Sequence, residues 1–159
     1  PLIIHARPSK GTQHPVGYQL PFGSPAAGGA GDAGDAYHDV IELLKEAKLT
    51  HPNLRGDIHF FVGGIPEAEA LIALNFTLSF TAVITFARDY DEVIRSVPLT
   101  SILSETDAPY VAPVTRRGER NDPLSIKDVV SKIASISGED PEIVRTTLLA
   151  NARHLFALS

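Results

Sequence analysis

The sequence contains no cysteine, no methionine and no tryptophan among its 159 residues. Without cysteine it has no disulfide and no thiolate metal ligand, so any metal would be held by histidine, aspartate or glutamate. It also lacks an apolar run of about 18 residues, the length that a membrane-spanning helix needs. We therefore expect no membrane partner and a reducing compartment, the cytoplasm or the nucleus.

Positive charge is scarce as well, because the sequence has 14 lysine and arginine residues but 19 aspartate and glutamate residues, which gives a net charge of -5. This balance argues against a sequence-independent coat on nucleic acid, since such proteins usually show a basic face. It does not exclude a nuclease, because a bound divalent cation supplies positive charge where a phosphate binds. The hydrophobic content of 43% is enough for a globular core.

Three apolar segments end in side chains that could bind a metal. They are Leu2 to His5, Asp57 to Phe61 with His59 inside it, and Ile102-Leu103 before Glu105-Thr106-Asp107. The carboxyl ends of parallel strands meet at one rim of a (β/α) barrel, where such enzymes place their active sites. Two imidazoles and a carboxylate at that rim predict a metal site.

Strand-like and helix-like segments alternate along the chain, which predicts an α/β fold with a parallel sheet. The capping box Asp89-x-x-Glu92 and the cap Asp140 mark two helix starts, and Gly138 marks a helix end. The expected strands are 2–6, 57–62, 77–85 and a fourth that carries Glu105 to Asp107; the expected helices are 37–48, a short one near 66–72, one after residue 89, 125–135 and 141–156.

These segments make four βα units, half of a TIM-type (β/α)₈ barrel that typically needs about 250 residues. The chain begins at Pro1 inside an apparent strand and contains no methionine. We therefore expect residues 1–159 to be the C-terminal half of a single larger barrel. Residues 10–35, rich in glycine, proline and alanine, are expected to form a loop insertion over the same rim.

Several motifs resemble the TatD family of metal-dependent deoxyribonucleases, amidohydrolase-like TIM barrels. The resemblance covers nearly the whole chain apart from the insertion, and Glu105-Thr106-Asp107-Ala108-Pro109-Tyr110 followed by Arg117-Gly118-x-Arg120-Asn121 is its most specific part. The other matching segments are His5-x-Arg7, Ile58-His59-Phe60-Phe61-x-Gly63, Leu78-Ser79-Phe80 through Phe86, and Asn151-Ala152-x-x-Leu155-Phe156.

The resemblance implies roles for three residues. His5 and His59 would help to bind the second of two divalent cations, Mg²⁺, Mn²⁺ or Zn²⁺, and Asp107 would bind the first and position or deprotonate the attacking water. The expected substrate is DNA, at its ends or as single strands. The family's His-x-His pair and bridging glutamate have no counterpart in this sequence, so we expect activity only together with a missing N-terminal half, and an inactive chain alone.

Other polar residues keep two interpretations. Arg7, Arg117 and Arg120 suit phosphate contact through a planar fork of donors, or else Arg117 and Arg120 pair with acids such as Glu119 and Asp122. Glu105 shares the face of Asp107 and either orients a ligand histidine or anchors the barrel interior. The remaining polar candidates are expected to be surface histidines (His14, His38, His51, His154) and a backbone-capping asparagine (Asn151).

Two other functions fit the same residues. The scaffold could hydrolyse an amide or an ester instead of a phosphodiester, because the fold does not dictate the substrate. The chain could also be a non-catalytic half-barrel subunit or binding module, which would have to cover its open sheet edges by association. The presence of both histidines and Asp107 favours the enzyme.

Overall fold

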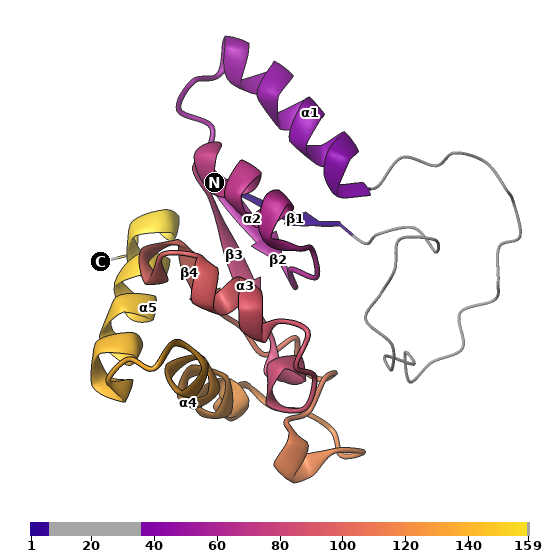
Figure 1. The fold of residues 1–159 in the computed structure, drawn as a ribbon, viewed down its shortest axis with the longest axis vertical. Coiled ribbons are helices and arrows are strands. Elements are labelled where there is room, and N and C mark those ends of the chain that lie inside the picture. Colours follow the sequence, from indigo (N-terminus) through magenta and orange to yellow (C-terminus); the bar gives the residue numbers. More distant parts are fainter. Residues whose placement is uncertain (7–35, 159) are drawn as a thin grey trace, which may run out of the picture.

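The computed structural model describes residues 1–6 and 36–158 (Figure 1). Four parallel strands form one sheet in the order β1-β2-β3-β4, and within the described ranges helices alternate with them, which confirms the predicted α/β architecture. The strands are β1 (Leu2–His5), β2 (Gly56–His59), β3 (Phe76–Phe80) and β4 (Ile102–Ser104); the α-helices are α1 (Ala36–Thr50), α2 (Ile65–Ala73), α3 (Asp91–Ser96), α4 (Ile126–Ser137) and α5 (Pro141–Phe156).

Each strand pairs with the next one along the chain, so every crossover moves one strand in the same direction. Crossovers between parallel strands are right-handed, and a run of them in one direction places all the helices on the same face of the sheet. This is the arrangement of a partial barrel. Figure 1 shows α2 and α3 against the sheet and α1 next to α2.

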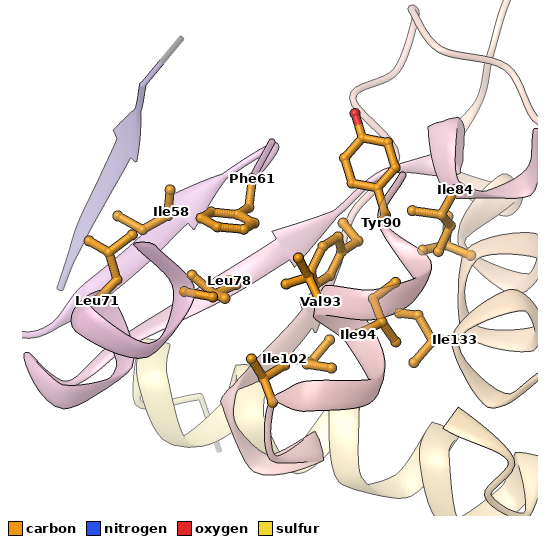
Figure 2. Packing of buried hydrophobic residues seen from close by; sticks show 14 of the residues in the cluster. Ile58, Phe61, Leu71, Leu78, Ile84, Tyr90, Val93, Ile94, Ile102 and Ile133 are labelled. Carbon is orange, nitrogen blue, oxygen red and sulfur yellow. The ribbon is translucent and has the colours of Figure 1, made fainter. Parts of the chain in front are cut away.

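The hydrophobic core lies between the sheet and its helices. Ile58, Leu78 and Ile102 lie side by side in register on β2, β3 and β4 and are fully buried on the same face of the sheet. Figure 2 shows Leu71 of α2 against Ile58 and Leu78, and Ile94 of α3 next to Ile133 of α4. The residues next to them along the strands, such as Asp57 and His59 on β2, face the other way, where the polar side chains of the site lie.

The third strand is shorter than the prediction of 77–85. It ends at Phe80, because the hydroxyl of Thr81 accepts the N–H of Val83 and starts a 3₁₀ helix, η1 (Ala82–Thr85). The predicted capping box at Asp89 is wrong: α3 begins at Asp91 after Tyr90, and no side chain caps it. Both differences lie in the segment that joins β3 to α3.

The two closing helices follow the predicted signals. Gly138 adopts the left-handed conformation, φ 76°, and ends α4, and one Asp140 carboxylate oxygen accepts the N–H groups of Glu142 and Ile143 at the start of α5. The amide of Asn151 donates to the carbonyls of Leu99 and Ile102 at 2.9 and 2.8 Å, so it does cap backbone groups. Within the described ranges, no helix is long and apolar enough to cross a membrane.

Candidate metal centre

His5 and His59 lie side by side at the carboxyl end of the sheet. They are the last residues of β1 and β2 and are paired in register, and their ring centroids are 5.4 Å apart with an interplanar angle of 41°. The predicted meeting of two strand-end imidazoles is therefore present. Arg7, which follows the first strand and was predicted to contact phosphate, lies outside the described residues, as does the whole 10–35 insertion.

Glu105 holds His59 in place. One carboxylate oxygen is 2.5 Å from Nδ1 of His59, and the other accepts the backbone N–H of Phe60 at 2.6 Å. When Glu105 is ionised it only accepts, so Nδ1 of His59 donates to it and the lone pair of the neutral imidazole is on Nε2. Of the two roles considered for Glu105, this contact favours the one that orients a histidine. Metal-binding histidines commonly have such a carboxylate partner.

The carboxyl group of Glu105 is also partly removed from water. Burial raises its pKa above the ordinary value, and the neighbouring His59 and the N–H of Phe60 oppose that rise. Phe60 itself adopts a left-handed backbone conformation, φ 51°. A non-glycine residue rarely adopts this conformation, and here it directs the N–H group at Glu105.

Asp107 lies on the other side of His59. Its Oδ1 is 3.5 Å from Nε2 of His59, the nitrogen that Glu105 leaves with a lone pair. Two donor atoms at this separation can both reach one cation at about 2.0–2.2 Å. Asp107 follows β4 rather than lying in it and is also left-handed, φ 52°. Strained non-glycine residues cluster at functional sites, and both Phe60 and Asp107 adjoin this one.

Asn121 supports the turn that contains Asp107, a role that sequence reasoning missed. Its buried amide nitrogen donates to the carbonyls of Thr106, Tyr110 and Val111 at 2.8, 2.7 and 3.2 Å. Its oxygen accepts from the N–H of Asp122 and the hydroxyl of Ser125. The only sequence signal was the place of Asn121 in the Arg-Gly-x-Arg-Asn motif, which says nothing about these partners.

The arginines after β4 separate into three environments. Arg116 pairs with Asp122 at 2.7 Å and donates to Ser125, so it takes the acid that was considered as a partner for Arg117 and Arg120. Arg117 lies over the ring of Phe86 with its guanidinium carbon 3.9 Å from the ring centroid. Arg120 is exposed.

Three of the four histidines predicted to lie on the surface, His38, His51 and His154, are exposed, and His14 lies outside the described residues.

A buried carboxyl group lies below the site on the inner face of the sheet. Asp57 accepts a hydrogen bond from Thr77 at 2.7 Å and another from Ser79. Burial raises the pKa of Asp57, and these two hydrogen bonds partly oppose the rise. The group lies two residues before His59 on the same face of β2, so the wall beneath the histidine is polar rather than apolar.

These donors suit a divalent cation in kind. A neutral imidazole with a fixed lone pair and a nearby carboxylate are ligands for Zn²⁺, and carboxylate oxygens also suit Mg²⁺ and Mn²⁺. Among residues 1–6 and 36–158, however, no three histidine or acidic side chains come close enough together to form a metal site. What the described residues bring together is one pair of possible donors, Nε2 of His59 and Oδ1 of Asp107, 3.5 Å apart.

Comparison with known proteins agrees with this description. The family model for TatD related DNase matches residues 31–157. The metal-dependent hydrolase YcfH of Escherichia coli K12 is 36% identical over 124 residues, which cover 77% of this chain and 46% of that protein. The protein named 3'-5' ssDNA/RNA exonuclease TatD from Erwinia billingiae is 34% identical, with 78% and 49% covered.

Solved structures give the same result. The crystal structure of the TatD homologue YjjV from E. coli superposes with a TM-score of 0.68 at 28% identity, covering 75% of this chain and 46% of that one. A partial barrel with histidine and carboxylate side chains at its carboxyl edge fits the class of metal-dependent hydrolases to which YcfH is assigned by name. The chain belongs to the TatD-related DNase family. It spans about half the length of the curated relatives that it matches.

Proposed function

We propose that the protein is a metal-dependent phosphodiesterase that hydrolyses DNA, at its ends or as single strands. The observation that carries this proposal is the triad of side chains in which Glu105 fixes His59 and His59 directs its free nitrogen at Asp107. The family supports the reaction class, and one relative is named as an exonuclease on single-stranded DNA and RNA. Because the chain spans about half of these relatives, the activity is assigned to the protein as a whole.

Each residue has a separate task in this proposal. His5, His59 and Asp107 would hold two divalent cations, Mg²⁺, Mn²⁺ or Zn²⁺, which when bound neutralise charge on the phosphate and make water more acidic. Asp107 accepts the proton of the attacking water and orients that water towards phosphorus. Glu105 keeps the lone pair of His59 directed at the site. Arg120 contacts phosphate oxygens through its planar fork.

The proposal is tested by following hydrolysis of a labelled single-stranded oligonucleotide by the whole protein with Mg²⁺, Mn²⁺ or Zn²⁺, and again with excess EDTA. Asp107→Asn keeps the size of the side chain but removes its charge and basicity, and we expect it to lower kcat by at least about 100-fold. Glu105→Gln loses the charge and keeps one acceptor oxygen for two donors, Nδ1–H of His59 and the N–H of Phe60, and we expect a loss of about 10–100-fold in metal affinity and activity.

Glu119→Gln is the matched control, because Glu119 is exposed on the same loop and its side chain has no hydrogen-bonding partner among the described residues. We expect this variant to retain full activity. Hydrolysis that continues in EDTA, or that Asp107→Asn leaves intact, would contradict the proposed function.

A further inference from the structure

The loops after β3 and β4 are joined by a stacked pair of side chains, Arg117 and Phe86. The guanidinium carbon of Arg117 lies 3.9 Å from the centroid of the Phe86 ring, which is close contact for a cation over an aromatic face. We propose that this pair is a stacking platform that binds one base of a single-stranded nucleic acid. The inference rests on the proposed function and adds a binding subsite to it.

The two loops hold the platform in a fixed position. The N–H of Val114 donates to the hydroxyl of Thr85 at 2.9 Å, and that hydroxyl donates to the carbonyl of Ala82 at 2.7 Å. Thr85 adjoins Phe86, and Val114 begins the short 3₁₀ helix η3 (Val114–Arg116) that leads into Arg117. These bonds join the residue before Phe86 to the start of the 3₁₀ helix that leads into Arg117, so less loop freedom is lost when a ligand binds.

Position favours a role in substrate binding. The loops follow the carboxyl ends of β3 and β4, and this is the edge of the sheet at which His59 and Asp107 meet. In barrels of this type the loops after the strands build the substrate site. A chain of nucleotides that places one phosphate at Asp107 would therefore pass over the same edge.

The free groups of Arg117 indicate what it would bind. Arg117 is exposed and has no hydrogen bond or ion pair with any residue in the described ranges, whereas the adjacent Arg116 is bound to Asp122. Phe86 covers one face of the guanidinium, which leaves the other face and the N–H edges available. Nucleobases stack on guanidinium planes and on aromatic rings, with little dependence on the base. In a duplex those base faces are already covered, so the platform favours single strands.

The test is a binding measurement in the whole protein with the inactivating change Asp107→Asn in every sample. Fluorescence anisotropy follows a labelled oligothymidylate and an abasic oligonucleotide of the same length. Arg117→Lys keeps the charge but loses the plane, and Phe86→Leu loses the ring. Each should weaken oligothymidylate binding by at least about fivefold. Neither should change binding of the abasic strand, which has phosphates but no bases.

Two further comparisons isolate the pair. The double variant should bind no more weakly than the weaker single variant, because the two side chains act as one unit. Arg153→Lys is the matched control: Arg153 is exposed on α5 and has no side-chain partner in the described part, so its binding should not change. If Phe86→Leu fails to fold, as circular dichroism would show, the exposed Arg117→Lys variant decides alone.

Failure of this inference differs from failure of the proposed function. If the unmodified protein hydrolyses the oligonucleotide but Arg117→Lys binds oligothymidylate as the parent does, the platform is wrong and the function stands. Equal losses for the base-containing and abasic strands would also overturn the platform, because they would show a charge contact only. If the unmodified protein neither binds nor hydrolyses the oligonucleotide, both proposals fail.

Discussion

At the scale of single residues, the burial of the Asp57 carboxyl group affects the stability of the folded protein. It is 3% exposed on the inner face of the sheet, where burial raises the pKa of its carboxyl group. A carboxyl group whose pKa is higher in the folded than in the unfolded protein stabilises the fold fully only below its ordinary pKa, about 4. That contribution is lost as the pH rises through the higher folded-state pKa. At neutral pH, Asp57 therefore lowers stability.

We expect Asp57→Asn to raise the melting temperature at pH 7.5 by about 2–4 °C, the shift that about 1 kcal/mol produces in a chain of this size. The amide keeps the side chain's size, and the hydroxyls of Thr77 and Ser79 can rotate to bond with it. At pH 4 the gain should shrink, because the raised pKa of Asp57 favours its protonated form in the folded protein as the pH falls. Thermal unfolding followed by circular dichroism at both pH values measures this.

Glu46→Gln, which removes an exposed acidic charge on α1, serves as the control and should change the melting temperature little at either pH. A lower melting temperature of Asp57→Asn at pH 7.5 would mean that the charged form of Asp57 is favourable in the fold.

At the scale of elements, Gly56 fixes how closely the first three strands pack. A Cβ atom at this position would lie 2.4 Å from the carbonyl oxygen of Leu2 and 2.6 Å from a ring carbon of Phe76. Both neighbours are its register partners on β1 and β3. The same register places His5 beside His59 three residues later, so the packing at Gly56 supports the geometry of the site.

Gly56→Ala should therefore destabilise the protein by about 1–3 kcal/mol, the usual cost of overpacking a core. Denaturant unfolding measures this loss. The site is expected to suffer as well, and isothermal titration with Mn²⁺ should show weaker binding. Ser131→Ala on the exposed surface of α4 is the comparison and should stay within about 0.5 kcal/mol of the parent. An unchanged stability for Gly56→Ala would show that β1 can shift freely against β2.

At the scale of the whole molecule, two asparagines bind backbone carbonyls at opposite ends of β4, one of them next to the candidate site and the other away from it. Asn121 binds three carbonyls around Asp107 at one end of β4. Asn151 binds the carbonyls of Leu99 and Ile102 and attaches the last helix, α5, to the other end of the same strand. Both side chains therefore satisfy backbone carbonyl groups. Leaving such a group without a partner would lower the free energy of unfolding by about 1–3 kcal/mol.

We expect Asn121→Ala and Asn151→Ala to lose similar stability, about 1–3 kcal/mol each. Only Asn121→Ala should also weaken Mn²⁺ binding, because only it releases the turn of Asp107. The two variants are thus controls for each other, measured by denaturant unfolding and by isothermal titration at a temperature at which both are folded. Equal metal affinity in the two variants would show that the turn holds its shape without Asn121.

The local features of the fold could be predicted from the sequence because each depends on residues a few positions apart. The alternation of apolar residues, Gly138 at the end of α4 and Asp140 at the start of α5 are of this kind. The end of β3 was predicted wrongly because a β-branched run continues past Phe80, while the hydroxyl of Thr81 starts a 3₁₀ helix. The β-strand propensity of the individual residues gives no information about this competing hydrogen bond.

The sequence by itself determined the α/β class, the order of the elements and the chemical kinds of donor, since these follow from periodicity and composition. The tertiary structure decided which donors meet. Glu105 reaches His59 across 46 residues of sequence, Asn121 surrounds the Asp107 turn, and Arg117 finds Phe86 rather than an acid. These contacts depend on strand register and loop packing, which bring distant residues together only when the whole sheet has formed.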